Sequence, residues 1–162
     1  MRMRVLLFFV VALVAVSTDA SAFSSSAPQG GWSNLTSERL QQLPSSVRTA
    51  IVTAQKVCGE ESISVRSGFI RYLKDVNGDE FVALHFDRFH CANRSALCIS
   101  TRCLHQIFVA RSGLAHREVW RDHVQEVDMT NETGRMSANV ECSREGGHCA
   151  TMLQWNGKQL VR

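Results

Sequence analysis

KDVNGDEF, residues 74–81, is the stretch that decides the fold. Asn77-Gly78 at its centre is the strongest short-range signal for a tight turn between two antiparallel strands, because asparagine and glycine both tolerate a positive φ. Asp75, Asn77 and Asp79 also place oxygen-bearing side chains at alternate positions, which is typical of calcium loops. The stretch therefore predicts either a hairpin turn or a cation site, and its neighbours must decide between them.

Alternating apolar residues flank the stretch on both sides. Residues 69–74 and 81–86 have the pattern of strands, and in the second strand Val82 and Leu84 alternate with Ala83 and His85, which predicts one buried face. The same reasoning predicts further strands at residues 104–110, 118–127, 137–142, 149–155 and 160–161. Successive short strands separated by turn signals are typical of a meandering antiparallel sheet.

One helix is expected before the sheet. Val47, Ile51 and Ala54 recur at helical spacing after Pro44, and Gly59 is a suitable stop. Such a helix cannot bury its apolar stripe alone and needs a sheet beneath it. The expected fold class is therefore α+β: an antiparallel β-sheet meander with one N-terminal amphipathic helix packed on it, stabilised by disulfides.

The first residues have the composition of a cleavable secretory signal. A basic start, Met-Arg-Met-Arg, precedes an apolar run at residues 5–16 and a small-residue cleavage site, Ala20-Ser21-Ala22. The run is shorter than the roughly 20 residues that a membrane-spanning helix needs. We expect a signal peptide at 1–22, a flexible Ser/Gly-rich arm at 23–35, a single α+β domain at 36–162, and a secreted or periplasmic location without a membrane span.

The chain's six cysteines all follow the predicted signal, and their even number in an oxidising compartment predicts disulfides. A zinc cluster is the alternative, but the close C-x-x-C spacing that zinc sites favour does not occur in the sequence. Gly146-Gly147 allows the chain to reverse between Cys142 and Cys149. The expected pairs are Cys142 with Cys149, Cys98 with Cys103 across a short loop, and Cys58 with Cys91.

The calcium interpretation of residues 75–79 lacks two defining residues. An EF-hand loop has glycine at its sixth position and a bidentate acid at its twelfth, where this chain has Glu80 and Phe86. The stretch also resembles the D-x-N-x-D-G-x-x-D loops of FG-GAP-type repeats, but Ala83 takes the place of the last acid. A weak calcium site with Asp75, Asn77 and Asp79 as ligands remains as the alternative to a plain hairpin turn.

The order of several motifs resembles that of small secreted or periplasmic cysteine-containing proteins of alphaproteobacteria with a D-x-N-G-D hairpin. These motifs are Cys58-Gly59, the 75–79 stretch, Cys91, Cys98 and Cys103 leading into LHQIFV at 104–109, and LQWNG at 153–157. Such relatives often carry D-x-N-G-D-G and C-G-x-x-G-C, and this chain departs from both patterns. The resemblance covers most of the chain after residue 22. It implies an extracytoplasmic location and an architecture, without an activity.

Six histidines raise the possibility of a transition-metal site. His85 and His90 have opposite parity along one extended segment and should face opposite ways, whereas His105 and His123 are able to meet across neighbouring strands. Their spacing does not require such a meeting, so we expect scattered surface or half-buried histidines. No cofactor is expected, with calcium as the possible exception.

The sequence predicts binding rather than catalysis. It contains no nucleophile elbow, H-E-x-x-H, P-loop or Rossmann fingerprint. Its 18 basic and 15 acidic residues interleave, which makes nucleic acid an unfavourable partner. We expect an exported non-catalytic binding domain, inhibitor-like, an adaptor or host-facing, whose partner is a protein or an envelope component. The alternatives are a weak calcium-binding module and an extracytoplasmic enzyme with an unrecognised site.

Overall fold

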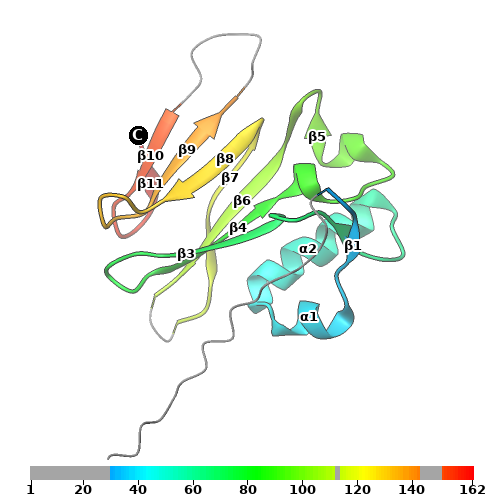
Figure 1. Ribbon diagram of the computed structural model, residues 1–162, viewed down its shortest axis with the longest axis horizontal. Helices are drawn as coiled ribbons and strands as arrows, with labels where there is room; N and C mark the ends of the chain where they lie inside the picture. Colours follow the sequence, from blue (N-terminus) through cyan, green and yellow to red (C-terminus); the bar gives the residue numbers. More distant parts are fainter. Residues whose placement is uncertain (1–29, 112–113, 143–150) are drawn as a thin grey trace, which may run out of the picture.

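The computed structural model describes residues 30–111, 114–142 and 151–162. Their elements form three layers (Figure 1): a central antiparallel sheet has the two α-helices on one side and a second antiparallel sheet on the other. The chain is therefore mostly antiparallel β-structure with few helices. The predicted signal peptide, residues 1–22, and the start of the predicted arm lie outside the described residues.

The central sheet is built around β6 (Arg102–Ala110). On one side β6 pairs with β4 (Glu80–His85) and, farther along, with β5 (Cys98–Ile99), and on its other side it pairs with β7 (Arg117–Val124). The edge strand β3 (Ile70–Lys74) pairs with β4. All of these pairings are antiparallel, as the alternating sequence pattern predicts.

The 74–81 stretch connects β3 to β4 and so forms the predicted hairpin. Lys74 and Glu80 are its last paired residues, and Gly78 N–H donates to the Asp75 carbonyl oxygen at 3.1 Å. Gly78 alone takes a left-handed conformation in the connection, with φ +81°. The turn is therefore five residues long, rather than the two-residue turn that Asn77-Gly78 indicates.

The second sheet has the strand order β11-β10-β9-β8. Its strands are β8 (Glu126–Thr130), β9 (Ser137–Glu141), β10 (Thr151–Trp155) and β11 (Leu160–Val161). Gln125 alone separates β7 from β8, and its N–H donates to the Glu141 carbonyl oxygen at 2.7 Å, which extends the β8–β9 ladder. The expectation of one continuous meander was wrong, because the stretch predicted as one strand at 118–127 leaves the central sheet at Gln125 and enters the second.

Strand β4 is buried on both faces, whereas the sequence predicted one buried face. Val82 and Leu84 pack in the cluster beneath the helices, and Phe81 and Ala83 pack in the cluster shared with the second sheet. Side chains alternate along a strand, so both sets become buried once layers cover both faces of the sheet. The second sheet is the layer that the alternation pattern did not reveal.

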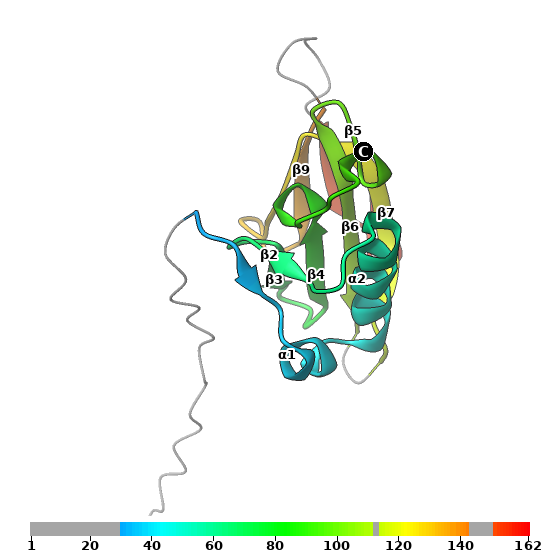
Figure 2. The ribbon, with the colours of Figure 1, turned by 90° about the vertical axis from the view of Figure 1, so that its right-hand side faces the viewer.

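The described residues contain two α-helices rather than the single one expected. Helix α2 (Ser45–Cys58) buries Val47, Ile51, Ala54 and Cys58, and Gly59 follows it with φ +70°. The short α1 (Ser37–Gln42) precedes it and is capped by Thr36. Figure 2 shows α2 running alongside β6 and β7. None of the helices in the described ranges is long and apolar enough to cross a membrane.

Short elements complete the helix side of the molecule. β1 (Ser33–Asn34) pairs with β2 (Ser64–Val65), so the folded part begins before residue 36 and includes the end of the predicted arm. The 3₁₀ turns η1 (Phe86–Arg88) and η2 (Arg94–Ala96) lie between β4 and β5.

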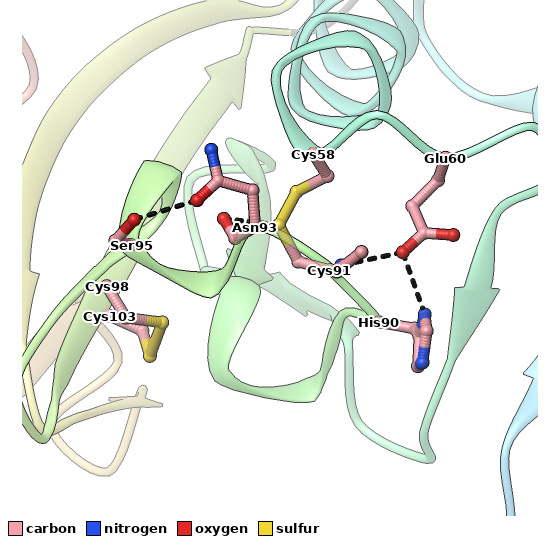
Figure 3. The surroundings of a disulfide bond; sticks show 9 residues. Cys58, Glu60, His90, Cys91, Asn93, Ser95, Cys98 and Cys103 are labelled. Atoms are coloured by element: carbon pink, nitrogen blue, oxygen red, sulfur yellow. Dashed lines mark hydrogen bonds and ion pairs between the residues drawn. A yellow bond between two sulfur atoms is a disulfide. The ribbon is translucent and has the colours of Figure 1, made fainter.

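Two disulfides stabilise this side of the chain (Figure 3). Cys58 at the end of α2 is bonded to Cys91, and Cys98 is bonded to Cys103 across the β5–β6 hairpin. These are two of the three pairs that the sequence predicted. The third predicted pair, Cys142 with Cys149, includes a residue outside the described ranges and stays a prediction.

Candidate functional site

The carboxylate of Asp75 is buried and is bonded to its own loop. Its Oδ1 accepts hydrogen bonds from the backbone N–H groups of Asn77 at 2.9 Å and Asp79 at 3.0 Å. Its Oδ2 accepts a longer bond, 3.4 Å, from the amide of Asn77. Asp75 therefore provides the hydrogen-bond acceptor for two backbone N–H groups that the turn would otherwise bury without partners.

The second expected calcium ligand, Asp79, is directed toward the second sheet. Its Oδ2 accepts a hydrogen bond of 2.9 Å from the indole N–H of Trp155, and its Oδ1 lies 3.8 Å from Nε of Arg111. Both acids thus have structural roles in the hairpin. Calcium binding by Asp75, Asn77 and Asp79 stays a prediction.

Substitutions at Asp75 measure how much its hydrogen bonds stabilise the hairpin. We expect Asp75→Ala to lower the free energy of unfolding by about 2–3 kcal/mol, because it leaves the N–H groups of Asn77 and Asp79 without their charged acceptor. Asp75→Asn retains an oxygen acceptor and should cost about 1 kcal/mol or less. Urea unfolding in the presence of a chelator measures both values, and equal losses for the two variants would contradict this account.

The same pair of variants tests the calcium prediction. A calcium ion at this loop requires a melting temperature that is higher in millimolar calcium than in chelator for the unmodified chain, and a smaller difference for Asp75→Asn. If the turn is purely structural, calcium leaves both melting temperatures unchanged.

A groove lies between helix α2 and the central sheet. It has a volume of about 580 Å³, and more than half of its surface is apolar. Small residues of α2 form one wall, while apolar side chains of β6 and of the segment before it form the floor. Representative lining residues are Thr49, Ala50 and Thr53 of α2, and Leu97, Leu104 and Phe108.

Polar side chains of β6 and β7 stand at one side of this groove. The carboxylate of Glu118 accepts hydrogen bonds of 2.8 Å from both Gln106 Nε2 and Arg121 Nη2. Gln106 is buried, whereas Glu118 and Arg121 are exposed. The groove therefore combines an apolar floor with a few fixed polar groups, the usual composition of a ligand site.

A buried cluster of titratable side chains lies at the end of β4 that is distant from the 75–79 turn. His85 and His105 are directly opposite each other in the β4–β6 ladder, and their Nδ1 atoms are 3.2 Å apart. The carboxylate Oδ1 of Asp87, in η1, lies 3.9 Å from Nε2 of His105. One ligand atom can be chosen from each of the three residues so that the three atoms all lie within 4.8 Å of one another.

Burial keeps the two imidazoles uncharged. It lowers the pKa of His85 to about 3, and His105, Arg88 and Arg71 add to the shift. Burial likewise lowers the pKa of His105 to about 4, against the opposing effect of the Val124 backbone. At neutral pH both rings thus offer lone pairs, the form in which histidine binds metals.

The cluster also has polar atoms without partners. Among the described residues, no hydrogen-bond partner stands in suitable geometry for Nε2 of His85, Nε2 of His105 or Oδ1 of Asp87. Burial raises the pKa of Asp87 as well, and the guanidinium of Arg88 lies 3.7 Å from its other oxygen. Native proteins rarely bury several such atoms together, so the cluster calls for a chemical explanation.

His90 and His123 lie outside the cluster of His85, Asp87 and His105. His90 lies on the surface, where its Nδ1 is 3.1 Å from the Glu60 carboxylate, and His123 is paired with Leu104 rather than with His105. The sequence pattern does not reveal the grouping of His85 with His105, nor the approach of Asp87 to them. Only the register between β4 and β6 would have revealed it.

Comparison with known proteins gave no relative for this chain: neither a family model, nor a curated protein, nor a solved structure matches it.

Proposed function

We propose that this chain is an exported non-catalytic binding domain that holds an apolar segment of its partner in the groove between α2 and the central sheet. The composition and size of the groove carry this proposal. Its volume of about 580 Å³ falls within the range of small-ligand sites, roughly 300–1,000 Å³. The partner is a protein or an envelope component, and the domain acts as an inhibitor-like module, an adaptor or a host-facing factor.

The lining of the groove fits an apolar occupant. Ala50, Thr49 and Thr53 present short side chains toward it, which leaves room above the floor formed by Leu104 and Phe108. Burying apolar surface there is favourable by about 25 cal/mol per Å² removed from water. The hydrogen-bonded set on Glu118 would orient a polar group at one side of the occupant.

Export is the second part of the proposal. The predicted signal peptide at residues 1–22 supports it, and so do the disulfides Cys58–Cys91 and Cys98–Cys103, because such bonds persist in oxidising compartments. The location is then periplasmic or secreted. The alternatives, a calcium-binding module and an enzyme with an unrecognised site, stay predictions.

Site-specific photocrosslinking tests the groove directly. A benzophenone amino acid at Thr53, which lines the groove, should give discrete partner adducts when the tagged chain is irradiated in its own envelope. The same group at Lys56 is the matched control, since Lys56 is exposed on α2 and does not line the groove. Mass spectrometry then identifies the adducts, and we expect those from Thr53 to be at least about tenfold more abundant.

Filling the groove provides the complementary measurement. Ala50→Trp should reduce the Thr53 adducts by about tenfold, the effect of losing roughly 1.4 kcal/mol of binding free energy. Lys56→Trp should leave them unchanged. Adducts of equal abundance from positions 53 and 56, or adducts that survive Ala50→Trp, would contradict binding in the groove.

A further inference from the structure

The buried cluster of His85, Asp87 and His105 is separate from the groove and has no role in the proposed binding. The two histidines lie on the face of the central sheet that also carries Phe81, Ala83 and Ile107, toward the second sheet. His85 is 4% exposed and His105 is 2% exposed. Asp87 is only partly buried, because it belongs to the η1 turn at the surface.

We propose that His85, Asp87 and His105 together bind one divalent transition-metal ion of the zinc class. Two imidazoles and one carboxylate form a donor set suited to zinc, copper, nickel or ferrous iron, whereas calcium and magnesium require oxygen ligands. The donors come from two paired strands and the turn that follows the first strand, and one ligand atom of each lies within 4.8 Å of the others. Metal bound through the Nδ1 atoms would also supply the partner that Oδ1 of Asp87 lacks.

The distance between the two imidazoles fits such an ion. Two nitrogen ligands at the usual zinc distance of about 2.0–2.1 Å stand about 3.3 Å apart in a tetrahedral site. The Nδ1 atoms of His85 and His105 are 3.2 Å apart. The carboxylate Oδ1 of Asp87 lies 3.9 Å from His105 Nε2, and one ligand atom of each of the three residues lies within 4.8 Å of the other two.

The lone pairs of the two rings favour the same conclusion. When two neutral imidazoles face each other through Nδ1, one nitrogen must donate a proton and the other accept it, or their lone pairs repel. An ion between the rings removes this constraint, because both nitrogens then act as ligands. Arg88 does not block the carboxylate, since it approaches Oδ2 of Asp87 and leaves Oδ1 facing His105.

The site has an entry path and an open position. Asp87 has a side chain 35% exposed, so an ion can reach the histidines from the side of the η1 turn. Three protein ligands leave a fourth position for water, as in zinc sites that are not closed. The site therefore resembles an ion-binding or exchange site more than a closed structural one.

Metal titration of the purified chain, with its disulfides intact and after treatment with a chelator, tests the proposal. Zn²⁺ should bind with a stoichiometry of one and raise the melting temperature. Co²⁺ should give visible d–d absorption that Zn²⁺ abolishes. We expect His105→Leu to weaken Zn²⁺ binding at least about a hundredfold, and Asp87→Asn to weaken it by about tenfold or more.

Two controls keep the result interpretable. His90→Ala removes a surface histidine outside the cluster and should leave Zn²⁺ affinity unchanged. Metal-free His105→Leu leaves the buried Nδ1 of His85 without its partner and should melt somewhat lower than the unmodified chain, so circular dichroism first checks that it folds. If His105→Leu does not fold, Asp87→Asn at the surface carries the test. Absence of saturable Zn²⁺ binding, or equal affinity in the cluster variants and in His90→Ala, would overturn the proposal.

Discussion

Replacing both Cys58 and Cys91 with alanine should lower the free energy of unfolding by about 3–4 kcal/mol. The two cysteines are 33 residues apart, and in the chain-entropy account a crosslink of this length removes that much loop-closure entropy from the unfolded chain. The bond also holds the end of α2 against the segment that follows β4 (Figure 3). Its removal should therefore loosen the helix side of the molecule more than the second sheet.

The other described disulfide is a matched control for this prediction. Cys98 and Cys103 are only 5 residues apart, so the same account gives about 2 kcal/mol for their replacement with alanine. Guanidinium unfolding of the two double variants, under non-reducing conditions, measures the difference. Equal losses would show that loop length does not determine the contribution of these bonds.

The elements of this fold that depend on local sequence could be predicted. The hairpin around Gly78 lies where the turn residues indicate, and Cys98 with Cys103 are close enough in sequence for a short bridge to be expected. The break at Gln125 could not be predicted, because the residues around it have the composition of a continuous strand. Such a strand bends only where a second sheet is present to pair with its far end, and the local sequence does not show whether that sheet exists.

The candidate sites show the same contrast between features visible in the local sequence and features that depend on the assembled fold. The two oxygen-bearing acids of the 75–79 stretch are visible in the sequence, but their hydrogen bonds to Asn77, Asp79 and Trp155 are not. The His85–His105 pair depends on a register between strands 20 residues apart. One residue of slip would turn one of the two rings to the other face, so alternation along a single strand carries no information about this pair.

The expected effect of Trp155→Ala is a loss of about 3–5 kcal/mol in the free energy of unfolding, which is typical for deleting a buried aromatic side chain. Trp155 is 4% exposed and packs edge to face against Phe81, with ring centroids 5.5 Å apart. Its indole N–H is also the donor to Asp79. A single side chain of β10 therefore joins the second sheet to the β3–β4 hairpin, and its removal weakens both the core between the sheets and the turn.

Two further variants separate these contributions. Trp155→Phe keeps an aromatic ring beside Phe81 but removes the donor to Asp79, and it should cost about 1–3 kcal/mol. Met152→Ala changes an exposed side chain, 55% accessible, on the same strand and should stay within about 0.5 kcal/mol. Urea unfolding with a common slope ranks the three. If Trp155→Phe were as damaging as Trp155→Ala, the hydrogen bond to Asp79 rather than the packing would join the hairpin to the second sheet. If Trp155→Ala were as mild as Met152→Ala, the two sheets would be held together without this residue.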